Sequence, residues 1–185
     1  DSQTAQELIA PVEQAIHERL GEYIWGYDDD TPSQSAGRSL IEKGLSVAVI
    51  EMCTGGALTN SITDVPESIN YFKGGTVAYD EAALQTYGVP ADVMNQHGVV
   101  SQQSANAMAD TVRRNLNADF GVAVTGVPGP GEFEGKPLGL AYICVTNGEQ
   151  AREMEMRLPP RRVTIKRRVP NQALIELRRL IEITG

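Results

Sequence analysis

The sequence predicts a three-layer α/β/α sandwich around a central, mostly parallel or mixed sheet, and three observations lead to this fold class. Short apolar runs alternate with helical patterns from Leu45 onward, which is typical of strands that helices cover on both faces. Glycine-bearing turns follow two of these runs, as in open α/β sheets. The chain has 185 residues, of which 41% are hydrophobic and 22% charged, and this suits one α/β domain with a short appendage.

The first thirty residues predict a helix and a strand that precede the domain. Apolar residues recur at helical spacing from Thr4 to Leu20, and Gly21 ends this pattern. Residues 22–27 form an aromatic strand candidate. Asp28–Asp30 offer carboxylates for a cation, but adjacent residues in an extended chain point to alternating sides, which favours a solvated linker. Because the chain starts at Asp1 without an initiator methionine, we expect an excised piece of a longer chain, in which residues 1–30 are an appendage or the tail of another domain and residues 31–185 form the α/β domain.

The elements of the domain follow from their periodicity and their end signals. Thr31 and Pro32 suit the N-cap and first turn of a helix that Gly44 ends. Pro170 should kink the last helix or divide it in two. Alternating apolar and charged residues predict an edge strand over 150–158. The other expected strands are 45–51, 75–79, 120–125 and 138–146, and the expected helices are 31–43, a short one ending near 63, 81–87, 90–96, 101–116 and 163–183.

The net charge of −8 is unevenly distributed. Residues 151–185 hold nine basic and four acidic residues, so the first 150 hold seven basic and twenty acidic ones. Three interpretations of the basic segment remain open: a phosphate clamp that includes Arg162, a solvated helix face that pairs with an acidic neighbouring subunit, and a nucleic-acid surface. The last is disfavoured because no aromatic residues are interleaved with the charges. The six cations concerned are Arg157, Arg161, Arg162, Lys166, Arg167 and Arg168.

Several other classes of protein are disfavoured by composition. No stretch approaches the roughly 18–20 apolar residues of a membrane span, so no membrane partner is expected. Cys53 and Cys144 lie far apart and outside any CxxC spacing, which argues against a disulfide scaffold and against a zinc site. We therefore expect a cytoplasmic protein without a metal.

Two glycine-bearing turns are the main candidates for a ligand site. They are Glu51–Gly56 and Val124–Gly131, and each follows a predicted buried strand. Their glycines permit close approach of the backbone to a ligand, and the helix N-terminus after Gly56 would favour an anion. The segment Gly131–Pro137 is not a phosphate-binding loop, because it has one residue too few between its glycines and proline follows its lysine. On spacing alone, a ligand cradle and plain tight turns remain equally open.

An ordered series of motifs between residues 51 and 139 resembles the C-terminal domain family of CinA, the competence/damage-inducible protein. The family pattern runs E-S-C-T-G-G, D-V-P-G-S-S, Y-F-x-G-G-x-V-x-Y-S-N with a lysine shortly after, H-G-x-V-S, A-V-T-G-x-A-G-P-G and K-P-x-G. Residues 18–26 also resemble the end of the linker domain that precedes this domain in longer CinA chains. The matching stretches are Glu51–Gly56, Asp64–Ile69, Tyr71–Tyr79, His97–Ser101, Ala123–Gly131 and Lys136–Gly139.

This resemblance implies hydrolysis of nicotinamide mononucleotide (NMN) to nicotinic acid mononucleotide and ammonia, by a serine and a lysine and without a cofactor. A serine hydroxyl becomes a useful nucleophile only when a neighbouring base takes its proton. The chain departs from the family at these positions, where it has Met52, Ile69 and Ala83, and where Glu67 replaces the glycine before the serine pair. The resemblance therefore predicts a retained fold and nucleotide pocket with impaired catalysis.

The remaining candidate residues have alternative structural roles. Ser68 is a weak candidate nucleophile or a helix cap, and Cys53 is a weak candidate nucleophile or a buried packing residue. His97 is expected to be structural, and Tyr79 is expected either to bind a ligand or to end its strand. The resemblance and the spacing together predict these substrate-binding residues: Thr54, Gly55, Gly56, Tyr79, Thr125, Gly126, Gly129, Gly131, Lys136 and Arg162.

Three functional hypotheses follow from the sequence. The first is a CinA-like domain that retains a nucleotide pocket and has lost most of its deamidase activity. The second is an active amidohydrolase that uses Cys53 or Ser68. The third is a structural or oligomerisation module of a longer CinA chain. A homo-oligomer and an NMN-like small molecule are the expected partners.

Overall fold

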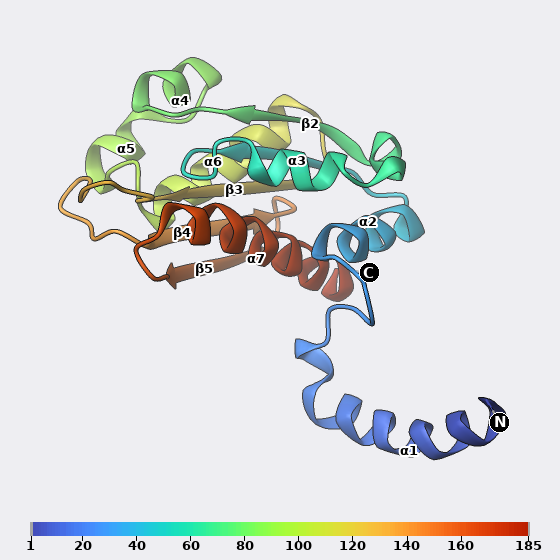
Figure 1. The fold of residues 1–185 in the computed structure, drawn as a ribbon. Helices are drawn as coiled ribbons and strands as arrows, with labels where there is room; N and C mark the ends of the chain where they lie inside the picture. The colour runs from blue at the N-terminus through green and yellow to red at the C-terminus, as the bar shows by residue number, and fades with distance from the viewer. Residues whose placement is uncertain (1, 185) are drawn as a thin grey trace.

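The computed structural model describes residues 2–184 as a five-stranded mixed sheet with helices on both faces, together with a separate N-terminal helix (Figure 1). The strand order is β2-β1-β3-β4-β5. The first three strands are parallel and the last two are antiparallel to their neighbours. This confirms the predicted three-layer α/β/α class. The strands are β1 (Val47–Glu51), β2 (Phe72–Val77), β3 (Phe120–Gly126), β4 (Leu140–Thr146) and β5 (Ala151–Arg157).

The helices divide between the two faces of the sheet. On one face, α2, α3 and α7 pack over Val47 and Val49, while the alternate residues Ala48 and Ile50 of the same strand belong to the core under the helices of the other face. This alternation is the two-residue repeat of a strand buried on both sides. The helices are α2 (Pro32–Lys43), α3 (Ala57–Thr63) and α7 (Arg162–Ile183), then α4 (Glu81–Tyr87), α5 (Ala91–His97) and α6 (Gln102–Asn115).

Local signals set several of these boundaries. The Thr31 side chain accepts a hydrogen bond from Gln34, Pro32 opens α2, and Gly44 closes it in the left-handed region, as predicted. The strand predicted over 75–79 instead runs from Phe72 to Val77, because its register is set by pairing with β1. A short 3-10 helix, η2 (Pro66–Asn70), precedes it.

One local prediction was wrong, and one of the two alternatives for Pro170 is excluded. Residues 22–27 do not form a strand: Gly21–Tyr23 form a 3-10 helix, η1, and the following residues pair with no strand of the described chain. Aromatic residues favour strands, but this segment does not pair with an edge of the sheet. Pro170 does not divide the last helix, which is continuous from Arg162 to Ile183. Ile165 and Val169 before it and Ala173 and Leu174 after it are buried in one core, and this packing holds the two halves of α7 together.

Helix α1 (Ser2–Leu20) stands apart from the sandwich and is joined to it through η1 and the segment that leads to α2 (Figure 1). Leu8, Val12, Ile16 and Leu20 recur every four residues and are all exposed. Asp30 in the connecting segment pairs with Arg38 at 2.7 Å, and this hydrogen bond lowers the pKa of Asp30. Among the helices described, none has both the length and the apolar character that a membrane span requires.

A tight contact between Gly37 of α2 and Tyr71 gives a stability prediction. A Cβ atom on Gly37 would lie 2.7 Å from the Tyr71 hydroxyl oxygen, and this buried hydroxyl has no hydrogen-bond partner among the described residues. Gly37→Ala should therefore lower the free energy of unfolding by about 1–2 kcal/mol, since the clash outweighs the helix propensity that alanine adds. Tyr71→Phe should be neutral or slightly stabilising because it removes an unpaired buried group.

Urea unfolding of both single variants and the double variant checks this pair. We expect Gly37→Ala to cost less in the Tyr71→Phe background, because the shortest contact is gone. Equal costs in both backgrounds would contradict the proposed clash.

Candidate functional site

The carboxyl ends of β1, β2 and β3 meet at one edge of the sheet, and the loops after them form the candidate site. Because β4 and β5 run antiparallel, β4 begins and β5 ends at this same edge, and α7 begins just beyond it. Ligands of open α/β sheets gather at such an edge. The two glycine-bearing turns identified in the sequence, after β1 and after β3, are therefore brought together here.

The first turn is organised around the buried carboxylate of Glu51. One of its oxygens accepts hydrogen bonds from Thr54 Oγ1 at 2.6 Å and from the backbone amides of Gly56 and Leu58 at 3.1 and 2.9 Å. The other accepts from the amide and the hydroxyl of Thr59 at 2.7 and 2.6 Å. Glu51 thus serves as the anion at the start of α3. The amides that the sequence suggested for a ligand anion are used internally.

A cavity of about 220 Å³ lies between the turns that follow β1 and β3. Four of the predicted binding residues line it, namely Tyr79, Gly126, Gly129 and Gly131. Thr54, Gly55, Gly56, Thr125, Lys136 and Arg162 are not among its lining residues, and Thr54 and Thr125 are fully buried behind it. The complete lining is Met52, Cys53, Tyr79, Gly126, Val127, Pro128, Gly129, Pro130, Gly131, Glu132 and Phe133.

Met52 is buried and lines this cavity, at the position where the family pattern has a serine. Its backbone amide donates to the Val124 carbonyl at 3.0 Å, and its Sδ lies 3.3 Å from Thr125 Oγ1. That hydroxyl also lies 3.0 Å from the Val99 carbonyl, which is the stronger acceptor. A thioether has no proton to lose, so this position holds no nucleophile.

Cys53 also lines the cavity but is a poor nucleophile in this setting. Burial, and to a smaller extent the Glu51 carboxylate, raises the pKa of the Cys53 thiol to about 12. The thiolate is the reactive form, so at neutral pH almost none is present. Burial likewise raises the pKa of the Cys144 thiol to about 12.

These pKa values predict that both thiols resist a disulfide reagent while the protein is folded. Dithionitrobenzoate at pH 8 should label neither cysteine in the native protein and both in denaturant. Cys53→Ala and Cys144→Ala assign any residual signal to one thiol. Rapid native labelling that disappears in Cys53→Ala would contradict the buried, protonated state.

The other positions of the family's serine and lysine pattern lie outside the cavity. Ser68 and Ile69 belong to η2, which precedes β2 and therefore lies at the opposite end of the parallel strands from the cavity. Ser68 is buried, while Ile69 is 86% exposed. Ala83 lies in α4, where its amide donates to Asp80 at 2.8 Å. The structure thus brings Met52 and Cys53 into one cavity and leaves Ser68 outside it.

Lys136 has a structural environment in place of the suggested phosphate contact. Its Nζ donates to the His97 carbonyl and to Glu134 Oε2, each at 3.2 Å. Glu134 in turn accepts from the Val99 and Val100 amides at 2.8 and 3.1 Å. The two side chains therefore fasten the loop after β3 to the turn that follows α5.

The Glu134 contacts give a pH-dependent prediction. Burial opposes ionisation, but the hydrogen bonds from Val99, Val100 and Lys136 outweigh it, and the pKa of Glu134 falls below its ordinary value of 4.5. A lowered carboxyl pKa adds stability that is present above the ordinary pKa and is lost as pH falls through the native one. Glu134 is largely exposed and solvent screens these contacts, so Glu134→Gln should cost only about 0.5–1 kcal/mol at pH 7.

Chemical unfolding at a series of pH values checks this effect. The difference between wild type and Glu134→Gln should shrink as the pH falls below about 4.5. Glu149→Gln, a change in the exposed turn between β4 and β5, is the control. A difference between wild type and Glu134→Gln that is independent of pH would contradict the ionic role.

Two cations from the start of α7 stand at the mouth of the cavity. Arg162 Nη2 lies 3.1 Å from the Tyr79 hydroxyl, and a Cβ atom on Gly55 would lie 3.8 Å from Lys166 Nζ. Both residues fall on the helix face that is buried further along at Val169, Ala173 and Leu177, yet both are exposed. The face of α7 that packs on the core further along the helix therefore extends past the core at this end and lies next to the site.

Arg162 is one of the predicted binding residues, whereas Lys166 is predicted only as one of the six basic residues of the C-terminal segment. The sequence feature that indicates a place for Lys166 in the site is the helical spacing of residues 162, 166, 169, 173 and 177, which places both cations on the inward face of the helix.

Among residues 2–184, no group of three His, Cys, Asp or Glu side chains is arranged to hold a metal ion.

Comparison with known proteins identifies the family of this chain. The family model of the CinA C-terminal domain matches residues 29–181. The chain belongs to the CinA C-terminal domain family. This confirms the resemblance on which the motif analysis rests.

Two relatives are longer than this chain. A relative from Desulforamulus reducens, named as a competence-damage inducible protein, is 42% identical over 171 residues, which is 92% of this chain and 42% of that protein. A CinA-like protein from Gloeobacter violaceus is 38% identical over 95% of this chain and 42% of its own length. The chain thus spans less than half the length of the curated relatives it matches.

Solved structures of the CinA superfamily have the same fold. One from Klebsiella pneumoniae has a TM-score of 0.79 at 22% identity, and covers 82% of this chain and 96% of its own. A competence/damage inducible protein from Agrobacterium tumefaciens has a TM-score of 0.71 at 28% identity, and covers 86% and 100%. At 22% identity, the first likeness concerns the fold alone.

Proposed function

We propose that this CinA-family domain binds a phosphorylated pyridine nucleotide of the NMN type and has lost most or all of the amidohydrolase activity that the family resemblance implies. The observation that carries the proposal is Met52 in the lining of the cavity that lies between the two glycine-bearing turns. The backbone cradle is kept, while the position of the family serine has no ionisable group.

The charges around the cavity suit a zwitterionic nucleotide. Arg162 and Lys166 at its mouth can hold a phosphate monoester, and a guanidinium is well shaped for this because it can donate two parallel hydrogen bonds. Tyr79 and Phe133 offer aromatic faces to a pyridinium ring, which they attract through cation–π interaction. Glu132, also in the lining, adds a carboxylate on the side of the ring.

The alternative of an active enzyme has little support in the geometry. Cys53 is the only thiol in the cavity lining, its pKa is raised to about 12, and neither lysine nor histidine lines the cavity among the described residues. Ser68 lies at the opposite end of β2 from the cavity. A nucleophile without an adjacent base is a weak one.

Ammonia release from NMN tests the catalytic part of the proposal. We expect wild type to release no more ammonia than a blank without protein. Cys53→Ala and Ser68→Ala serve as matched variants, because each removes one candidate nucleophile. Turnover in wild type that either variant abolishes would overturn the proposed loss of activity.

A further inference from the structure

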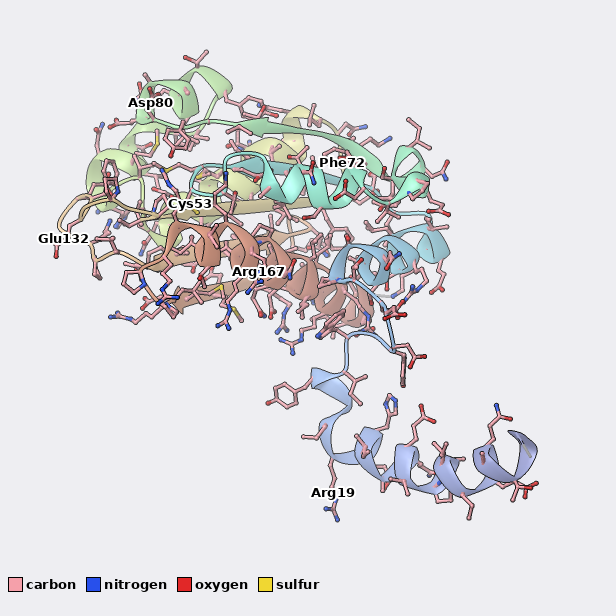
Figure 2. The ribbon with its side chains drawn as sticks, in the orientation of Figure 1. Arg19, Cys53, Phe72, Asp80, Glu132 and Arg167 are labelled. Atoms are coloured by element: carbon pink, nitrogen blue, oxygen red, sulfur yellow. The ribbon has the colours of Figure 1, made fainter. Side chains whose placement is uncertain are left out.

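The loop that follows β3 supplies most of the wall of the cavity. Eight of the eleven lining residues lie between Gly126 and Phe133. In Figure 2 the labelled Glu132 lies at the outer end of this loop, and the labelled Cys53 lies closer to the centre of the molecule. The shape of the cavity therefore depends on where this loop is held. We name residues 128–133 the cavity loop.

The cavity loop makes few contacts that could hold it in place. Val127, just before it, is fixed to the start of β4, because its amide donates to the Leu140 carbonyl at 2.8 Å and its carbonyl accepts from the Gly139 amide at 3.0 Å. Within the described part of the chain, none of residues 128–132 takes part in a hydrogen bond. Residues 130–133 are exposed. A segment with so little hydrogen bonding and burial moves easily unless its other end is also held.

Glu134 holds the other end of the cavity loop. Its carboxylate accepts hydrogen bonds from the Val99 and Val100 amides at 2.8 and 3.1 Å, and from Lys136 Nζ at 3.2 Å. The side chains of both valines are buried in the core. The carboxylate therefore joins the loop to a well-packed part of the domain.

The backbone conformation of Glu134 is an unusual one for glutamate. Glu134 and Gly135 are the central residues of a tight turn between Phe133 and Lys136, and their φ angles are 53° and 68°. Glycine, asparagine and aspartate are the usual residues at such positions, because most other side chains disfavour positive φ. Residues in strained conformations are found most often at functional sites. The contacts of the carboxylate, and not the turn itself, therefore account for a glutamate at this position.

Gly98 leaves the space that this contact needs. A Cβ atom on Gly98 would collide with the Glu134 carboxylate and would lie 2.8 Å from Lys136 Nζ. The φ angle of Gly98, 79°, also suits glycine. The motifs His97–Ser101 and Lys136–Gly139, which line no part of the cavity, thus meet at the Glu134 contact.

We propose that Glu134 is a positioning residue for ligand binding: it ties the cavity loop to the turn after α5 and so holds Phe133 in place for the pyridinium ring. This inference rests on the proposed function. Phe133 lines the cavity and is bonded directly to Glu134, so a displacement of Glu134 moves it. Arg162 and Lys166 belong to α7 and are held independently of this loop. Glu134 therefore acts on recognition of the ring and leaves the phosphate contact unchanged.

The ring preference of the site tests this role. It is the dissociation constant of ribose 5-phosphate, which lacks the ring, divided by that of NMN, with both measured by calorimetric titration. Glu134→Gly relieves the turn but removes the carboxylate, and it should lower the ring preference about tenfold because Phe133 loses its cation–π contact. Lys136→Met keeps the two amide contacts of Glu134 and should lower the ring preference only about twofold. Affinity for ribose 5-phosphate should be unchanged in both variants.

A matched control and a measurement without ligand complete the design. Glu149→Gly makes the same change in the exposed turn between β4 and β5 and should behave as wild type. Chymotrypsin cleavage after Phe133, relative to cleavage of a peptide with the same loop sequence, reports how often the cavity loop leaves its place. Glu134→Gly should be cut at least about tenfold faster than wild type. Circular dichroism verifies that every variant is folded.

Three outcomes would overturn the proposal. The first is an unchanged ring preference in Glu134→Gly. The second is an equal loss of affinity for NMN and ribose 5-phosphate, which would give Glu134 a general structural role. The third is cleavage after Phe133 that is as fast in wild type as in Glu134→Gly. Wild type that binds neither ligand would overturn the proposed function together with the role at the ring, whereas in a wild type that binds NMN these three outcomes contradict the role of Glu134 alone.

Discussion

Glu51→Ala should lower the free energy of unfolding by about 3–5 kcal/mol, the largest stability effect we expect from any single substitution in this chain. The Glu51 carboxylate is fully buried and accepts five hydrogen bonds from Thr54, Gly56, Leu58 and Thr59. Alanine leaves these donors without an acceptor and leaves a cavity at the end of β1. A buried donor without a partner costs about 1–3 kcal/mol, although relaxation of the loop recovers part of the sum.

Glu51→Gln is the matched control for this prediction. Its shape is almost unchanged, but one acceptor oxygen becomes an amide NH2 group, a donor that faces other hydrogen-bond donors. We therefore expect a loss between wild type and Glu51→Ala in urea unfolding. A loss below about 1 kcal/mol for Glu51→Ala would contradict the central role of the carboxylate in the turn.

Arg162→Ala combined with Lys166→Ala should weaken binding of NMN by about a hundredfold. Each substitution removes one charge-assisted contact to the phosphate. A loss of about 1.4 kcal/mol per contact weakens the affinity about tenfold for each substitution. Calorimetric titration measures the dissociation constants of the two proteins. Circular dichroism should be unchanged, because both side chains are exposed.

A matched control separates phosphate binding from a loss of overall charge. Arg168→Ala with Arg114→Ala removes the same charge from exposed sites away from the cavity, so we expect a change of less than about threefold. Nicotinamide riboside, which lacks the phosphate, should bind wild type and the Arg162/Lys166 variant equally weakly. Equal losses of NMN affinity in the two double variants would contradict a phosphate contact at the mouth of the cavity.

Much of the fold was predictable because its determinants are local in the sequence. The buried strands at Val47–Glu51 and Phe120–Gly126 are continuous apolar runs, and Thr31, Pro32 and Gly44 carry the end signals of α2. The errors came from context beyond the local sequence. Residues 22–27 had no sheet edge to join, and packing on both sides of Pro170 outweighed its effect on helix α7.

The site was predictable to a smaller extent, since spacing along the chain does not show which ends of the strands meet. Tyr79, Gly126, Gly129 and Gly131 line the cavity, whereas Ser68 lies at the far end of β2. The helix N-terminus after Gly56 was expected to favour a ligand anion, but Glu51 is bound there. The residue pattern alone does not show whether the amides at this helix N-terminus bind a carboxylate of the protein itself or the anion of a ligand.

The most direct test of the proposed function is a calorimetric titration of wild type with NMN, followed by analysis of the nucleotide recovered from the cell. We expect one saturable site per chain, intact NMN at the end of the experiment, and no ammonia above the blank. Recovery of nicotinic acid mononucleotide would contradict the loss of activity, and the absence of saturable binding would contradict the retained nucleotide pocket.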